Sequence, residues 1–291
     1  MHLIMSPSVL KVVAKPGTTP HLSFKLENKG DPALVTIQIL PFTPIGNNGQ
    51  VVVGKKLDAT IPFQPESSSI IFGTPFLLKS NSPQDISIQM SLPSQLSEKD
   101  YYFTVLASTT PFPESEGSTA LQFSTRIGSF VLLSVTSNGA VEQRLSIPLL
   151  SVPRSTIPLL SSVYESSTAI PLVFMAKNNG RNFVTTQGSV TISGWNQKQK
   201  YNLQEATVLS GTQRLLIDGS TCKSDCSKTY SLILKGFFIG KYTVTASVSS
   251  QRGERAVTAQ TTFVAFPFKL IGLLFLMALA FLWLRKNLVK E

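Results

Sequence analysis

The chain has 291 residues with 26 basic and 16 acidic side chains, a formal net charge of +10, and 42% hydrophobic residues. This composition is too apolar for a disordered chain, and 18 glycines and 18 prolines are too few for a collagen-like or low-complexity chain. At roughly 100 to 150 residues per domain, the length predicts two folded domains and a smaller element.

Most of the chain has the two-residue periodicity of β-strands. In DISIQMSL, residues 85–92, apolar side chains alternate with Ser and Gln, and in YTVTASVSS, residues 242–250, they alternate with Thr and Ser. Alternation of this kind is typical of antiparallel sheets with one face in water. Turn sequences such as NKGD, GNNG, SNGA and NNGR separate the segments, which predicts β-sandwiches.

One pattern occurs twice. Residues 24–30 and 174–180 share the pattern F-x-x-x-N-x-G, which predicts a strand that enters a turn where Asn and Gly tolerate positive φ. A late strand follows each copy, at residues 101–105 and 241–244, at separations that suit immunoglobulin-like units of about 100 residues. Chance similarity of two β segments is the alternative.

We therefore predict an all-β fold, with two immunoglobulin-like β-sandwich domains in tandem followed by one C-terminal transmembrane α-helix. The predicted domains are residues 1–136 and 137–262, and the predicted transmembrane helix is residues 263–286. Residues 287–291 would form a cytoplasmic tail.

Cys222 and Cys226 are the only cysteines, and they lie in the hydrophilic segment GSTCKSDCSK. Outside the cell their spacing predicts a local disulfide, whereas the cytosol would favour free thiols. Zinc needs about four ligands. The only histidines, His2 and His21, lie in the other predicted domain, so neither a metal site nor a cofactor is predicted.

The end of the chain predicts a membrane span. Residues 270–284, LIGLLFLMALAFLWL, carry no charge and are apolar on every face, unlike an amphipathic core helix. Fifteen residues rise only about 22 Å against a hydrocarbon core of about 30 Å, so the span takes in flanking residues from 263 onward. The anchor residues expected in the membrane are Leu270, Leu273, Leu274, Phe275, Leu276, Leu279, Phe281, Leu282, Trp283 and Leu284.

The charges that flank the span predict its orientation. Arg285, Lys286 and Lys290 follow it, whereas Lys269 alone lies close before it, so the positive-inside rule places the C-terminus in the cytoplasm and the N-terminal ectodomain outside. Export needs a signal, and MHLIMSPSVLK has neither a cationic segment nor a long enough apolar one. Either a signal peptide was removed or left out, or the protein is tail-anchored with its bulk in the cytosol.

Charge divides unevenly along the chain. Residues 1–136 hold 9 basic and 9 acidic side chains, whereas residues 137–262 hold 13 and 6, a net charge of +7. The basic domain would either lie against anionic lipid headgroups or wall polymers, or present a solvated face. Nucleic acid is not a predicted partner, because the cations are scattered and the predicted topology places the domain outside the cell.

No sequence motif predicts catalysis. The segment GFFIGK, residues 236–241, has three residues between its glycines where a phosphate-binding loop has four, and Tyr242 follows instead of Ser or Thr. The chain has no HExxH and no GxSxG, and two histidines leave little choice of a catalytic base. A non-enzymatic protein is expected.

The layout resembles that of the bacterial WxL-interacting proteins, in which two immunoglobulin-like domains precede one transmembrane helix. The resemblance rests on PSVLKVVAKPGTTPHLSFKLENKG in the first half, and on NNGRNFVTTQGSVTISG, LSGTQR, GKYTVTASV and TTFVAFPF in the second. It implies an ectodomain that binds peptidoglycan or a partner surface protein. No binding residue of that family maps onto this sequence.

We therefore expect a single-pass cell-surface protein that binds a cell-wall polymer, such as peptidoglycan, or another surface protein. The alternative is a structural or assembly component, a chaperone-like module that holds partner strands by β-edge augmentation. An exposed apolar edge strand would favour the assembly role, and a concave aromatic patch would favour polymer binding.

Overall fold

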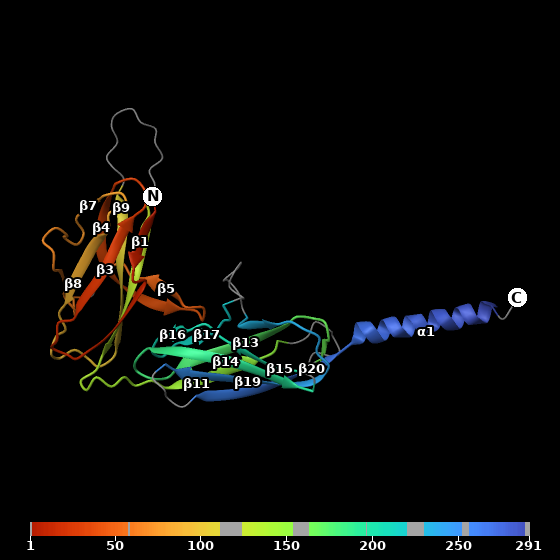
Figure 1. Cartoon of the computed structure of the whole chain (residues 1–291). Coiled ribbons are helices and arrows are strands. Elements are labelled where there is room, and N and C mark those ends of the chain that lie inside the picture. The colour runs from red at the N-terminus through yellow and green to blue at the C-terminus, as the bar shows by residue number, and fades with distance from the viewer. Residues whose placement is uncertain are drawn as a thin grey trace. The chain divides into compact units, whose positions relative to one another are not determined.

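The computed structural model describes residues 2–57, 59–110, 124–153, 163–195, 197–219, 230–251 and 256–288 (Figure 1). The chain divides into two compact units. Unit 1 comprises residues 1–143 and 180–183, and unit 2 comprises residues 144–179 and 184–291.

Unit 1 is built from two sheets. Its strands are β1 (Leu3–Ser6), β2 (Val9–Ala14), β3 (His21–Asn28), β4 (Ala33–Ile45), β5 (Gln50–Val53), β6 (Phe63–Pro65), β7 (Phe76–Leu78), β8 (Gln84–Met90), β9 (Asp100–Thr110) and β10 (Arg126–Val135). One sheet has the order β1-β3-β8-β6, and the other has the order β2-β10-β9-β4-β5 with β7 paired to β4. β2 runs parallel to β10, whereas the other pairs are antiparallel.

The predicted alternation places the core of unit 1 between these sheets. Ile86 and Ile88 of β8 are fully buried, and they belong to one apolar cluster with Ile37 of β4 and Val105 of β9. The polar residues between them on β8 point away from this cluster. Period-two alternation thus identifies the buried face of this strand correctly.

Unit 2 repeats this plan. Its elements are β11 (Leu145–Ser151), β12 (Val163–Glu165), β13 (Ile170–Asn178), β14 (Val184–Gly194), β15 (Lys198–Asn202), β16 (Ala206–Val208), β17 (Gln213–Leu215), β18 (Leu232–Leu234), β19 (Gly240–Ser250), β20 (Val257–Phe266) and α1 (Phe268–Leu288). One sheet has the order β11-β13-β17 with β18 on β13, and the other has the order β12-β20-β19-β14-β15 with β16 on β14. The pair β12–β20 is parallel, like β2–β10.

The predicted fold class is confirmed: the chain is mostly β, with two immunoglobulin-like sandwich units and one C-terminal helix. The order β12-β20-β19-β14-β15 matches β2-β10-β9-β4-β5 strand for strand. The two late strands noted in the sequence lie in β9 and β19, which are equivalent in this order.

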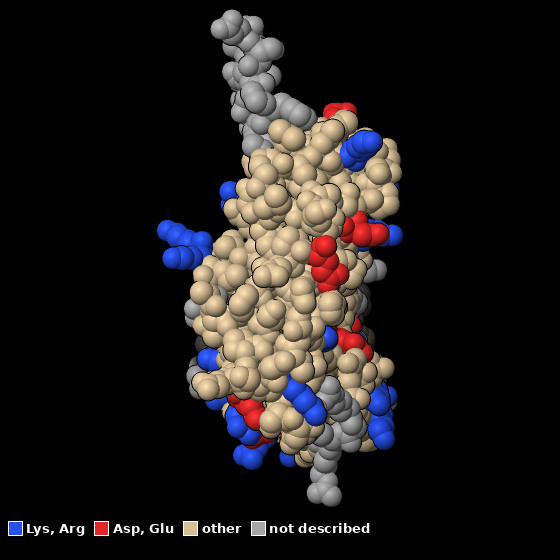
Figure 2. All heavy atoms as spheres, turned by 90° about the vertical axis from the view of Figure 1, so that its left-hand side faces the viewer, with Lys and Arg blue, Asp and Glu red and all other residues tan. Residues whose placement is uncertain are grey.

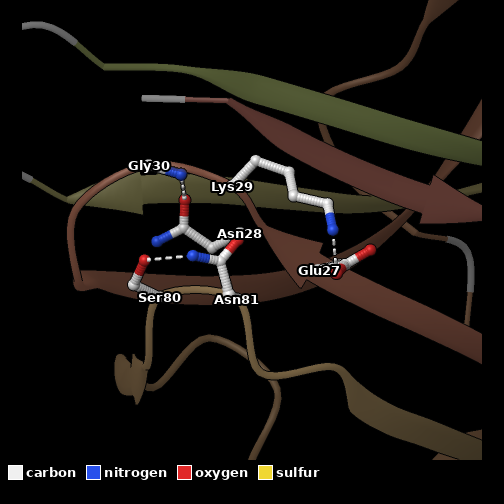
Figure 3. A network of polar contacts seen from close by, with 6 residues as sticks. All are labelled: Glu27, Asn28, Lys29, Gly30, Ser80 and Asn81. Atoms are coloured by element: carbon white, nitrogen blue, oxygen red, sulfur yellow. Dashed lines mark hydrogen bonds and ion pairs between the residues drawn. The ribbon is translucent and has the colours of Figure 1, made fainter.

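The shared pattern F-x-x-x-N-x-G lies at equivalent strand ends. Asn28 ends β3 and is fully buried, and its side chain accepts a hydrogen bond from the N–H of Gly30 at 3.0 Å (Figure 3). It also donates one to the carbonyl of Asp31 at 2.6 Å. Asn178 ends β13, is also fully buried, and donates to the carbonyl of Val208 at 3.2 Å. The pattern therefore reflects the repeated topology, because a buried amide satisfies backbone groups of the turn or of a neighbouring strand in each unit.

The helix α1 contains all the residues predicted as the membrane anchor, from Leu270 to Leu284. The window Phe268–Arg285 has a mean hydropathy of 2.0 and none of it is buried, so α1 is long and apolar enough to cross a membrane and is not a core helix of this chain. Arg285 and Lys286 lie near the end of α1, whereas Lys290 lies outside the described residues.

The helix begins at Phe268, later than the predicted residue 263. The reason is that Phe263 and Ala265 are buried in the core of unit 2 as part of β20, so this segment is a strand. Cys222 and Cys226 lie outside the described residues, and their disulfide stays a prediction.

Candidate functional site

Edge strands are the places where a sheet can accept another strand, and natural sheets protect them with cations, prolines or irregular pairing. In the described part of this chain, four of the edge strands carry such a feature. These features are Lys11 in β2, Pro65 in β6, Pro148 and a shift of register in β11, and Lys198 and Lys200 in β15. The edge strand β1 lacks them, but its Leu3 and Met5 are buried in the core.

The edge strand β5 has none of these protections. Its sequence, Gln-Val-Val-Val, has no charge and no proline, and it pairs in regular register with β4 from Phe42↔Val53 to Ile45↔Gln50. It ends the strand order of its sheet, and none of its side chains is buried. β5 is therefore an apolar strand with an open backbone edge.

The hairpin formed by β4 and β5 is apolar on both faces. Directly opposed residues of antiparallel strands share a face. One face therefore carries Phe42, Pro44, Val51 and Val53, and the other carries Thr43, Ile45, Gln50 and Val52. Val53 on the first face is 39% exposed and Val52 on the second is 49% exposed, so each face leaves apolar surface in water.

Local sequence explains why a hairpin forms here. The turn between the strands contains Gly46 and Gly49, with φ of 59° and 76°, values that glycine adopts without steric cost. After β5, the N–H of Gly54 donates to the carbonyl of Pro41 at 2.7 Å, and a Cβ on Gly54 would lie 3.0 Å from the Pro41 ring. The chain therefore leaves the hairpin close against β4.

The base of the hairpin is held by aromatic packing. Phe42 is buried and stacks on Tyr102 of β9, with ring centroids 5.6 Å apart, and it meets Phe130 of β10 edge-on at 5.0 Å. Such ring pairs contribute about 0.5 to 1.5 kcal/mol beyond area burial. The open edge is thus attached to a rigid base.

Low charge is common on unit 1, and the three-residue edge strand β7, Phe-Leu-Leu, is uncharged as well, so β5 is the longer of these two uncharged edges on β4. Figure 2 shows unit 1 from the side where Figure 1 labels β7 and β8, and most of that surface is uncharged. Residues 32–54 of the sequence also contain no charged side chain. The equivalent strand of unit 2, β15, has the sequence Lys-Gln-Lys-Tyr-Asn.

A hollow of about 440 Å³ lies in unit 2, between β14, β15 and β19. Its lining is mainly polar and consists of Gln187, Gly188, Ser189, Lys200, Asn202, Leu203, Glu205, Ser247 and Ser249. It contains no aromatic ring, so it is not the concave aromatic patch expected of a site that stacks on sugar rings. Binding of peptidoglycan or another wall polymer stays a prediction.

The described residues contain no group of three or more His, Cys, Asp or Glu side chains that could hold a metal ion. The segment 236–241 leads into β19, and Phe238 at its centre is buried in the core, so its backbone does not form a phosphate cradle. The structure thus assigns this segment a packing role.

Searches for related sequences find no protein-family model and no curated protein that matches the chain. Solved structures are similar in overall layout. They include the class 5 fimbriae chaperone CfaA (12% identity, TM-score 0.41, 89% of this chain and 99% of that chain) and the E. coli chaperone DraB (13%, 0.38, 90% and 96%). The Pseudomonas aeruginosa chaperone CupB2 is similar too (11%, 0.37, 88% and 98%), and at these TM-scores none of the likenesses identifies the function of this chain.

The sequence did not single out β5. Its signal was the uncharged stretch 32–54 with the turn GNNG, which predicts a hairpin. Nothing in that stretch says that its second strand ends the sheet.

Proposed function

We propose that this protein is a non-enzymatic, membrane-anchored binding module that holds an extended segment of a partner protein at the open edge of β5. The observation that carries the proposal is that β5 is uncharged, regular in register, apolar on both faces of its hairpin and unpaired on one side. In β-augmentation, the backbone of an added strand supplies hydrogen bonds and alternate side chains supply specificity. This is the assembly role that the sequence left as the alternative.

Burial of the exposed valines would supply part of the binding energy. Val52 keeps 49% of its surface in water, and Val53 keeps 39%. Because full burial of such a side chain is worth about 1.5 to 3 kcal/mol, covering the exposed part of each contributes about 1 kcal/mol. An apolar partner strand with alternating side chains fits this edge best.

The anchor in this proposal is α1, with the sandwich units outside the cell and the C-terminus in the cytoplasm. Support comes from the exposed apolar helix and from Arg285, Lys286 and Lys290 after the span, compared with Lys269 before it. A partner held at β5 would then be a surface or exported protein.

Selection of peptides of about seven residues against the full chain in detergent tests the proposed edge. Selected peptides should be apolar at alternate positions, and their binding should protect the amides of residues 50–54 from hydrogen exchange. Val52→Lys places a charge on the edge strand and should weaken binding at least about tenfold.

Thr43→Lys is the matched control, because Thr43 lies directly opposite Val52 on the same face but on the inner strand. This variant should bind the peptides nearly as well as the unmodified chain. Equal binding by Val52→Lys, or protection of another strand instead of β5, would exclude the proposed edge.

A further inference from the structure

Exposed aromatic side chains gather at the end of unit 2 from which α1 leaves. Trp195, in the turn between β14 and β15, is 84% exposed, and Phe237, between β18 and β19, is 44% exposed. Phe266, the last residue of β20, is exposed to the same extent as Phe237. Large exposed rings that lie near one another indicate an interaction surface.

Strand register places these residues at one end of the sheet. Gly194 lies opposite Tyr242 in the β14–β19 pair, and Gly240 lies opposite Ala265 in the β19–β20 pair. The turn that holds Trp195, the loop that holds Phe237 and the end of β20 therefore adjoin. A hydrogen bond of 2.8 Å from the Gln197 side chain to the carbonyl of Phe237 joins the first two.

The loop that carries Phe237 is anchored in the core of unit 2 by Phe238. Phe238 is buried and meets Tyr242 and Phe263 edge-on, with centroid distances of 5.3 Å and 5.8 Å. Its N–H also donates to the carbonyl of Ser166 at 2.9 Å. Because Phe238 fixes the loop in the core, the adjacent Phe237 is directed to the surface.

Cations surround the exposed rings. Lys198 follows the turn of Trp195, and Lys235 and Lys241 flank the loop of Phe237; all are exposed. Among the described acidic residues, Glu165 lies at this end, where its carboxylate accepts a hydrogen bond of 3.1 Å from the backbone N–H of Lys269. The end therefore has a net positive charge.

The start of the helix lies beside this surface. Pro267 is the only residue between the end of β20 and the start of α1 (Figure 1). One residue spans at most about 3.6 Å, so the first turn of α1 cannot move far from Phe266. If α1 crosses a bilayer, Phe266 lies at the level of the lipid headgroups.

We infer that this end of unit 2, formed by Trp195, Phe237, Phe266, Lys198, Lys235 and Lys241, docks onto a lipid surface that contains anionic headgroups. Aromatic rings prefer the membrane interface, and cations near it are attracted to anionic lipids. The exposed rings and the lysines of this surface therefore both suit the headgroup region that would lie beside the start of α1. The inference rests on the proposed membrane anchor. It also gives Lys198, Lys235 and Lys241 a partner in place of solvent.

Tryptophan fluorescence tests the inference, because Trp195 and Trp283 are the only tryptophans of the chain. Trp283→Phe leaves Trp195 as the single reporter at the proposed surface, and Trp195→Phe leaves Trp283 as the reporter of the helix. Each full-length variant is reconstituted into vesicles of phosphatidylcholine and phosphatidylglycerol, with or without bromine on the upper acyl chains. Docking predicts that the Trp195 emission shifts to shorter wavelength and that brominated lipid quenches it.

The charge requirement has its own control. Lys198→Glu with Lys241→Glu should reduce the quenching of Trp195, whereas Lys55→Glu with Lys56→Glu in unit 1 makes the same change in charge and should have no effect. Vesicles of phosphatidylcholine alone, or high salt, should weaken the quenching several-fold. Equal quenching in neutral vesicles would overturn the anionic part of the inference.

Two further outcomes separate this inference from the anchor. Quenching of Trp283 together with a water-exposed, unquenched Trp195 would overturn the docking and leave the anchor intact. Failure of brominated lipid to quench either tryptophan would overturn the anchor, and the docking with it.

Discussion

Gly194 lies directly opposite Tyr242 in the β14–β19 ladder, and the Tyr242 ring occupies the space above it. A Cβ placed on Gly194 would come within 2.3 Å of two ring carbons of Tyr242. The ring has no room to retreat, because it is fully buried and stacks on Phe263 with centroids 5.2 Å apart and planes at 8°. Glycine is therefore required at this position by a close approach.

Gly194→Ala should lower the free energy of unfolding by about 1 to 3 kcal/mol, because it overpacks this part of the core. Denaturant unfolding of the full chain in detergent measures the change. Gly272→Ala is the control, since a Cβ there meets nothing within 4 Å. Equal stability of Gly194→Ala and the unmodified chain would show that Tyr242 can move aside.

Separate pieces of the chain should fold on their own. The core of unit 1 draws on residues from Leu3 to Val135, and that of unit 2 on residues from Leu145 to Ala265, so each sandwich has its own apolar cluster. Residues 1–136 and 137–266 should each give β-type circular dichroism and a cooperative melt.

A second piece that ends at residue 262 sharpens this test. It lacks Phe263 and Ala265, both buried in the core of unit 2. Loss of a buried Phe side chain costs about 3 to 5 kcal/mol, so residues 137–262 should melt well below residues 137–266. A domain boundary at residue 262 would be supported only if both pieces melted alike.

Period-two alternation was enough to predict the strands that became β8 and β19, because each buries one face against a single core. The repeated pattern F-x-x-x-N-x-G supported the prediction of two sandwiches, and its two copies end equivalent strands at Asn28 and Asn178. The start of the helix was predicted too early, since Phe263 and Ala265 are as apolar as membrane residues but fill a protein core.

Neither of the two proposed binding surfaces could be predicted from spacing. β5 is an edge because of the order of strands in its sheet, and local sequence does not specify that order. Trp195 and Phe237 are far apart in the sequence and meet only through the register of β14, β19 and β20. The exposure of Phe237 also depends on Phe238, which takes the adjacent core position.

Stability should also depend on Asp100, the first residue of β9. Burial raises the pKa of this carboxyl group above its ordinary value of 3.8, although hydrogen bonds from Ser134 and Tyr102 favour the charged form. The folded state therefore holds this proton to a higher pH than the unfolded state does. Its contribution favours folding at low pH and is lost as the pH rises from 3.8 through the raised pKa.

Asp100→Asn removes this titration. The free energy of unfolding of the unmodified chain should therefore fall relative to that of Asp100→Asn as the pH rises from about 3.5 to about 7. Denaturant unfolding of both chains across this range measures the difference. A difference that stays constant with pH, or changes in the opposite direction, would show that the pKa of Asp100 is not raised.

Protease treatment of intact cells that make the protein tests the proposed orientation. With the sandwich units outside, added protease should digest them and leave a membrane-protected fragment of about 3 kDa, which contains α1 and the residues after it. An epitope placed after Glu291 should mark this fragment and should bind antibody only after the cells are permeabilised.

Lysed cells are the control for protease activity on the sandwich units. Digestion that occurs only after lysis would show that the orientation is reversed, with the sandwich units in the cytosol. The cations after the span would then lie outside, against the positive-inside rule. A partner of the β5 edge would in that case be a cytosolic protein.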